Sequence, residues 1–90
     1  MTAIDDARWL DGNAAGGMLA ELFGAEMTAS PRRCGSCREV HPVGAHRLYQ
    51  GAGFVLRCPS CGDVALRAAA VAGGQLVELR GTWQVVQRVG

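Results

Sequence analysis

Short runs of alternating apolar and polar residues, separated by glycine-containing turns, fill the second half of the chain. The runs 47–50 and 54–57 flank one such turn, and the runs 64–71 and 75–86 flank another. Turns of this length and composition are typical of antiparallel β-hairpins, so the pattern predicts two hairpins. Counting by twos along the last run places its larger apolar side chains on one face, which predicts a half-buried strand. These side chains are Val77, Leu79, Trp83 and Val85.

The first half of the chain carries one helical pattern, over residues 14–23. Asp11 or Asn13 can cap the N-terminus of this helix, and Gly24 can end it. The Gly16-Gly17 pair costs roughly 1 kcal/mol per glycine relative to alanine. We therefore expect the helix to depend on contact, either with the rest of the chain or with a partner protein. Its apolar, partner-docking stripe consists of Met18, Leu19, Leu22 and Phe23.

Charge divides the chain into two parts. Residues 1–31 carry five acidic residues and one arginine, a balance of −4, whereas residues 32–90 carry eight arginines and three acidic residues, a balance of +5, which together give the net charge of +1. We expect an N-terminal helical arm over 1–31, with a short strand at 26–29, and a ribbon domain over 32–90, within one globular unit. A chain of 90 residues buries a small core, so a metal or covalent staple is expected.

Four cysteines form two C-x2-C pairs separated by twenty residues. Two cysteines at this spacing can turn both sulfurs toward one ion, and a second pair completes a tetrahedron around zinc. The sequence has neither a signal-peptide pattern nor an apolar run long enough for a membrane span, so we expect a cytoplasmic protein whose cysteines bind metal rather than form disulfides. One Zn²⁺ per chain is expected, with iron as the less favoured alternative. The predicted ligands are Cys34, Cys37, Cys58 and Cys61.

The two cysteine pairs differ in the residue that follows them. Gly62 follows the second pair and can adopt the positive φ that directs backbone N–H groups toward the sulfurs, whereas Arg38 stands where a glycine would be usual after the first pair. C-x2-C followed by a hairpin and C-P-x-C-G resembles the zinc-ribbon and rubredoxin-like fold group. The predicted fold is small, metal-bound and mainly β: a zinc ribbon of antiparallel hairpins with two cysteine knuckles, plus a short N-terminal α-helix.

Almost the full chain is also similar to a family of short actinobacterial proteins of unknown function with one predicted zinc ribbon. The likeness is carried by residues 10–14, 25–28 and 56–61. It implies no established activity. It favours an accessory role beside other enzymes, including redox enzymes.

Three arginines of the predicted hairpins are candidates for contact with nucleic acid or a partner. If the apolar residues of neighbouring strands face the core, alternation places these arginines on the opposite face of the sheet. Such a basic face is found in nucleic-acid-binding ribbons, which often add an aromatic side chain for base stacking. This face has no aromatic by the same counting, and Glu78 interrupts it, so a solvated polar face is the alternative. The arginines are Arg57, Arg67 and Arg80.

The remaining candidate residues do not form a catalytic set. Four cysteines already fill a tetrahedral site, so we expect His41 and His46 at the surface or beside the site, and Trp9 and Trp83 in the core or at a docking surface. A closed site leaves no position for a substrate. We therefore expect a non-catalytic zinc ribbon that acts as a protein-interaction or accessory module and takes no small-molecule substrate. The alternatives are a nucleic-acid-binding ribbon and a rubredoxin-like iron electron carrier.

Overall fold

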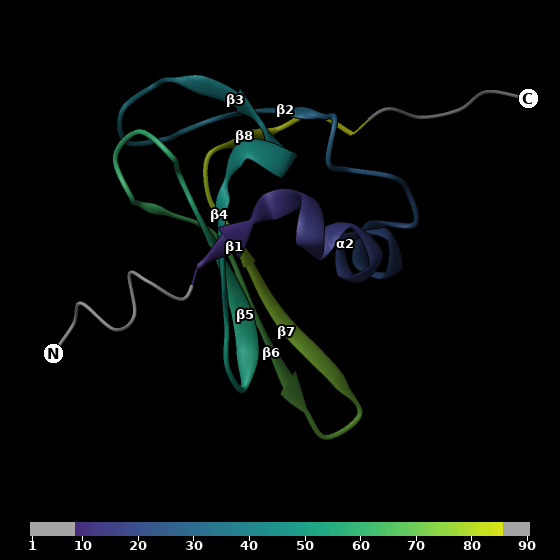
Figure 1. Cartoon of the computed structure of the whole chain (residues 1–90). Helices are drawn as coiled ribbons and strands as arrows, with labels where there is room; N and C mark the ends of the chain where they lie inside the picture. Colours follow the sequence, from purple (N-terminus) through teal and green to yellow (C-terminus); the bar gives the residue numbers. More distant parts are fainter. Residues whose placement is uncertain (1–8, 86–90) are drawn as a thin grey trace, which may run out of the picture.

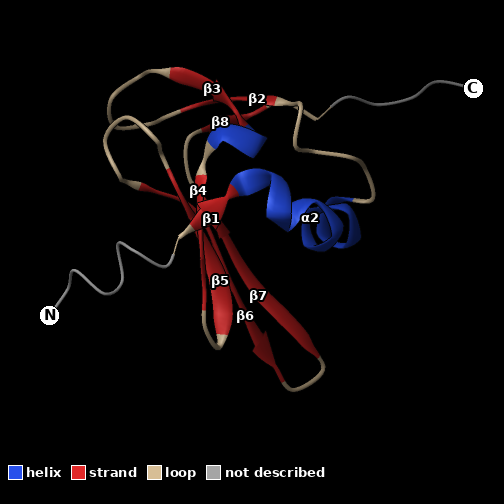
Figure 2. Ribbon diagram, in the orientation of Figure 1, coloured by secondary structure: helices blue, strands red, loops and turns tan. Residues whose placement is uncertain are grey.

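Two antiparallel sheets and one short helix make up the part of the chain that the computed structural model describes, residues 9–85. The larger sheet has the strand order β1-β4-β5-β6-β7 and the smaller one the order β3-β2-β8. Figures 1 and 2 show the small sheet at one end of the molecule and the β6–β7 hairpin extending to the other. The strands are β1 (Leu10–Asp11), β2 (Pro31–Arg33), β3 (Val40–Pro42), β4 (Arg47–Gln50), β5 (Gly53–Arg57), β6 (Val64–Val71), β7 (Gly74–Leu79) and β8 (Thr82–Trp83).

The helical segment begins with a 3₁₀ turn, η1 (Gly12–Ala15), and continues as the α-helix α2 (Gly16–Phe23). The Asp11 side chain accepts a hydrogen bond from the backbone N–H of Asn13 at the start, and Gly24 adopts the left-handed conformation at the end, as the sequence predicted. A second 3₁₀ turn, η2 (Val43–Ala45), connects β3 to β4. No helix among residues 9–85 is long and apolar enough to cross a membrane.

Both predicted hairpins form, but the last strand is shorter than predicted. Strands β4 and β5 pair from Arg47↔Arg57 to Gln50↔Phe54, and β6 pairs with β7 as far as Leu66↔Leu79. The predicted strand 75–86 breaks after Leu79 because Gly81 takes a φ of 83° and turns the chain toward the small sheet. Thr82–Trp83 then pair with β2. The far end of the predicted strand, Val86, lies outside the described residues.

Two further predictions about strands are wrong. The segment 26–29 is not a strand; a turn at Thr28-Ala29 leads into β2 instead. The predicted half-buried face of the last run also fails along β7, where Val77 and Leu79 are 42% and 44% exposed, although Trp83 is half-buried against the core. The helix reaches only the strands closer to the centre of the sheet, so the apolar side chains of β7 have no layer over them within the described chain.

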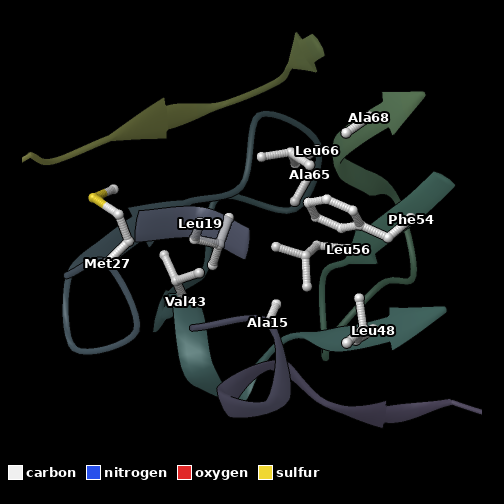
Figure 3. Close-up of a cluster of buried hydrophobic side chains, with 10 residues drawn as sticks. All are labelled: Ala15, Leu19, Met27, Val43, Leu48, Phe54, Leu56, Ala65, Leu66 and Ala68. Atoms are coloured by element: carbon white, nitrogen blue, oxygen red, sulfur yellow. The ribbon is translucent and has the colours of Figure 1, made fainter. Parts of the chain in front are cut away.

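The core lies between the helical segment and one face of the larger sheet. Figure 3 shows Ala15 and Leu19 meeting side chains from β4, β5 and β6. The apolar stripe of α2 therefore packs against the chain itself: Leu19 is fully buried, while Met18, Leu22 and Phe23 are half-buried against the core. The buried cluster comprises Ala15, Leu19, Met27, Val43, Leu48, Phe54, Leu56, Ala65, Leu66 and Ala68.

Candidate metal centre

The two cysteine pairs lie in two turns, each of which follows an inner strand of one sheet. The first pair begins directly after β2 and lies in the β2–β3 connection, and the second begins directly after β5 and lies in the β5–β6 connection. The β5–β6 register shifts between Leu56 and Arg57, so that Ala65 has no partner on β5 where the strands leave the second turn. Each sheet thus presents one turn to the site. The ligand sulfurs of both turns gather in one place.

The two turns have the same hydrogen-bond pattern. In the first, the N–H of Cys34 donates to the Glu39 carbonyl (2.9 Å) and the N–H of Arg38 donates to the Cys34 carbonyl (3.1 Å). In the second, Cys58 donates to Asp63 (2.9 Å) and Gly62 donates to Cys58 (2.9 Å).

Each turn also directs a backbone N–H at its first sulfur. Ser36 donates to Cys34 Sγ and Ser60 donates to Cys58 Sγ, both at 3.4 Å. Such bonds orient a thiolate ligand and stabilise its charge. The two turns therefore have matching backbone geometry, in spite of the different residues that follow them.

The sulfur positions match a tetrahedral site. All four Sγ atoms lie within 4.8 Å of one another. Cys34 Sγ lies 3.6 Å from Cys61 Sγ, and Cys37 Sγ lies 3.8 Å from Cys58 Sγ, so each short contact joins one knuckle to the other. A tetrahedral ion with metal–sulfur bonds of about 2.3 Å has sulfurs about 3.8 Å apart. The four cysteines thus form a cluster that can hold one metal ion.

The pKa values of the clustered thiols diverge. Backbone N–H groups of Cys37 and Ser36 donate to Cys34 Sγ and lower the pKa of Cys34 to about 6. The N–H of Glu39 lowers the pKa of Cys37, but desolvation and the hydrogen bonds shared with the other three thiols outweigh that bond and raise the pKa to about 12. A bound metal ion would deprotonate all four thiols, and its positive charge would offset the repulsion between sulfurs this close together.

Burial is uneven across the cluster. Cys34 and Cys58, the first residue of each pair, are buried, whereas Cys37 is half-buried and Cys61 is exposed. Cys34 and Cys58 are buried because they directly follow β2 and β5. One side of the site therefore faces solvent.

The predicted arginine stripe is engaged within the chain. Arg57 donates to the Gly62 carbonyl of the second knuckle (2.9 Å), and Arg67 forms a 2.9 Å ion pair with Glu78. Arg80 lies 3.9 Å from Asp63. Each of the three side chains therefore has a different local partner within the chain.

Two polar residues are buried beside the small sheet, and the sequence pattern did not single out one of them, Arg32. Arg32 and His46 are each only 1% exposed, although His46 was expected at the surface or beside the site. His46 Nε2 lies 3.2 Å from an Arg32 guanidinium nitrogen, and Nδ1 lies 3.0 Å from the Pro42 carbonyl. Two further Arg32 nitrogens donate to the Arg80 carbonyl at 3.1 and 3.0 Å. Arg32 therefore ties β2 to the segment where the chain leaves β7.

Burial lowers the pKa of His46, and the charge of Arg32 lowers it further, against the hydrogen bond to Pro42. The ring is therefore neutral, with Nδ1 donating and Nε2 accepting. His41 lies at the surface of the site, where Nε2 is 2.8 Å from Ser60 Oγ of the second knuckle. Because His41 follows the first knuckle on β3, this hydrogen bond joins the two knuckles outside the sulfur cluster.

The outer face of the larger sheet carries two arginine–aromatic pairs. The Arg47 guanidinium lies 4.9 Å from the centre of the Trp9 ring, and that of Arg57 lies 5.8 Å from the centre of the Tyr49 ring. Arg47 pairs with Arg57 across β4 and β5, which places both guanidinium groups on one face. The alternation pattern missed these aromatics, because Tyr49 lies on β4 and Trp9 lies just before β1, whereas the predicted stripe was counted on other strands.

Fold and site together define a small, mainly β protein with a short helix and a four-cysteine cluster suited to a metal ion. The chain belongs to a family of unknown function (DUF6510), whose signature matches residues 5–89. No curated protein and no solved structure matches the chain.

Proposed function

We propose that this protein is a structural zinc-ribbon module in which Cys34, Cys37, Cys58 and Cys61 hold one Zn²⁺. The observation that supports the proposal is the cluster of four sulfurs within 4.8 Å of one another, contributed by two knuckles with matching hydrogen bonds. Four protein ligands fill a tetrahedral ion and leave no position for water or substrate, which is the arrangement of structural rather than catalytic zinc. The role proposed for the chain is non-catalytic: a protein-interaction or accessory module in a reducing, cytoplasmic setting.

Zinc is proposed over iron on the charge around the site. Arg38 lies in the first knuckle, and Arg57 donates to a carbonyl of the second. Rubredoxin-like electron carriers surround the same ligand set with acidic and aromatic residues, whereas Arg38 and Arg57 lie beside these knuckles. A rubredoxin-like electron carrier is the iron-loaded version of the same ligand set.

Metal analysis of the full chain tests this function. We expect one equivalent of zinc in a colourless protein, and loss of that equivalent in Cys34→Ser and Cys58→Ser. Ser36→Ala is the matched control, since it changes a side chain in the same knuckle and keeps the backbone N–H that points at Cys34 Sγ. A red, iron-containing protein with a reversible one-electron couple would instead support the rubredoxin-like electron carrier. Wild-type protein without any bound metal would overturn the proposal.

A nucleic-acid-binding role is the second candidate, and the two arginine–aromatic pairs favour it. Guanidinium groups beside the exposed Trp9 ring and the half-buried Tyr49 ring are suited to a single strand, because the rings stack with bases and the arginines contact phosphates. Arg47→Ala and Tyr49→Ala should both weaken binding to single-stranded RNA or DNA. A plot of the logarithm of the binding constant against the logarithm of the salt concentration should have a slope of about −0.7 per phosphate contact. Arg67→Ala is the control, because its side chain is already paired with Glu78. Absence of binding at low salt would remove this candidate.

A further inference from the structure

Strand β7 forms an edge of the larger sheet, and its outer side pairs with no strand among residues 9–85. Figure 1 shows the β6–β7 hairpin extending beyond the helix. Soluble proteins protect an edge of this kind with proline, lysine, a bulge or a very short strand. The opposite edge follows this rule, since β1 has two residues, but β7 has six residues and contains neither proline nor lysine.

Apolar side chains of β7 are exposed to solvent. Leu76, Val77 and Leu79 are 65%, 42% and 44% exposed. The only charged residue within the strand, Glu78, is paired with Arg67 of β6. A six-residue edge strand with exposed apolar side chains is a template for another strand.

The register with β6 fixes which backbone groups of β7 are free. The N–H of Arg80 donates to the Ala65 carbonyl, and successive N–H groups of a strand point in opposite directions. The N–H and C=O groups of Glu78 and Leu76 therefore face β6. Those of Gln75, Val77 and Leu79 face outward, as three evenly spaced donor–acceptor pairs.

We propose that β7 pairs antiparallel with β7 of a second copy of this chain, about a two-fold axis at Val77. In this register Val77 lies opposite Val77 of the second copy, and Gln75 lies opposite Leu79. The three outward-facing residues on each strand then exchange all their free N–H and C=O groups, and the two larger sheets become one continuous sheet.

Side-chain chemistry selects this register over its neighbour. If the axis is shifted by one residue to Glu78, outward-facing N–H and C=O groups of the two strands still meet. This register, however, places Glu78 directly opposite Glu78 of the second copy, where like charges repel. With the axis at Val77, Glu78 lies opposite Leu76 on the outer face, and the two copies of Leu76 become diagonal neighbours within reach of each other. The strand is thus complementary to itself in hydrogen bonds and apolar contact, without placing like charges directly opposite each other, which is what a two-fold interface between identical chains requires.

The mass of the full chain in solution, with one equivalent of Zn²⁺ present, tests the proposal. Wild type should show twice the monomer mass of 9.4 kDa and dissociate on dilution. Val77→Pro should shift the mass to that of the monomer, because the proline removes an outward-facing N–H and no hydrogen bond to β6. Val77→Lys, which places a charge at the two-fold axis, should give the same shift if the proline variant fails to fold.

Val85→Lys is the matched control, since Val85 has nearly the same exposure as Val77, 41% against 42%, but lies outside β7. It should keep the wild-type mass. Amide exchange supplies the second measurement: Val77 and Leu79 should be protected at high protein concentration and exchange on dilution, while Leu76 and Glu78 stay protected by β6.

Three results would overturn the proposal. Wild type could keep the monomer mass at every concentration. The dimer could survive in both Val77 variants. The outward amides could be protected at all concentrations in a monomer, which would mean that residues of the same chain outside 9–85 cover the edge.

Discussion

Arg38 and Gly62 occupy equivalent positions in the two cysteine knuckles, and both have positive φ angles, 68° and 80°. Each donates its backbone N–H to the carbonyl of the first cysteine of its pair. Arg38 is the one non-glycine residue among residues 9–85 with a positive φ. The requirement for this conformation comes from the knuckle, since a chain that turns its N–H groups toward the sulfurs has to bend back at this point.

Replacing Gly62 tests the cost of that conformation. A Cβ at Gly62 meets nothing within 4 Å, so Gly62→Ala changes the backbone preference and little else. We expect a loss of about 1–2 kcal/mol in the free energy of unfolding, measured by urea denaturation with zinc present. Gly51→Ala is the control, because its Cβ is equally free and its φ is not positive. Equal stability of the two variants would contradict the argument.

Arg38→Gly tests the same conformation from the other knuckle. Glycine removes the strain of the positive φ but gains entropy in the unfolded chain, so we expect a change within about 1 kcal/mol. The variant should keep one equivalent of zinc. Loss of the metal would show that the Arg38 side chain, rather than the backbone turn, supports the first knuckle.

Metal removal should unfold the ribbon over residues 32–90, with the small sheet the most sensitive. The apolar cluster lies between the helical segment and the larger sheet, while β2 and β3 are joined at the first knuckle. Apparent binding energies of about 10–16 kcal/mol for structural zinc exceed the stability of a small domain. We expect a strong chelator to abolish the β-sheet circular dichroism of the wild type. A chelated sample that keeps this signal would contradict a structural role for the metal.

Acid should destabilise the fold through His46. The ordinary pKa of histidine is 6.5, and burial, followed by the charge of Arg32, lowers the pKa of His46 in the folded chain. Between these two pKa values the unfolded chain binds a proton that the folded chain does not, so this contribution to stability is present above pH 6.5 and is lost as the pH falls below it.

The His46→Gln variant isolates this effect from acid release of the metal. Glutamine keeps a hydrogen-bonding side chain at the site but does not titrate. The difference in free energy of unfolding between wild type and His46→Gln should shrink as the pH falls below 6.5. A difference that is constant with pH would show that His46 titrates alike in both states.

Gly53 should tolerate no side chain. A Cβ at this position would overlap the Ala68 carbonyl oxygen on the neighbouring strand β6. Because the clash is with backbone rather than a flexible side chain, Gly53→Ala should cost about 1–3 kcal/mol in thermal or urea unfolding. Gly74→Ala, in open space at the start of β7, is the matched control and should change stability little. Equal effects would mean that β5 and β6 separate at low cost.

Local patterns were sufficient for several elements of the fold. The helix stop at Gly24 and the two glycine turns depend on residues next to each other in sequence, so period and turn composition predicted them. The four cysteines were predicted as metal ligands in the same way, since the spacing within each C-x2-C pair is visible in the sequence itself.

Only the tertiary structure decided how these elements use their surfaces. Arg32 is buried because the Arg80 carbonyl and His46 reach it from distant parts of the chain, and neither partner is visible in the alternation of β2. The last strand divides at Gly81 because its second part pairs with β2 in the other sheet. Leu79 looks like a core residue by alternation, yet it is 44% exposed because the helix does not extend over β7. The sequence determined which residues could bind a metal or form strands, since those properties are local; burial and pairing depend on which segments meet, and folding alone brings them together.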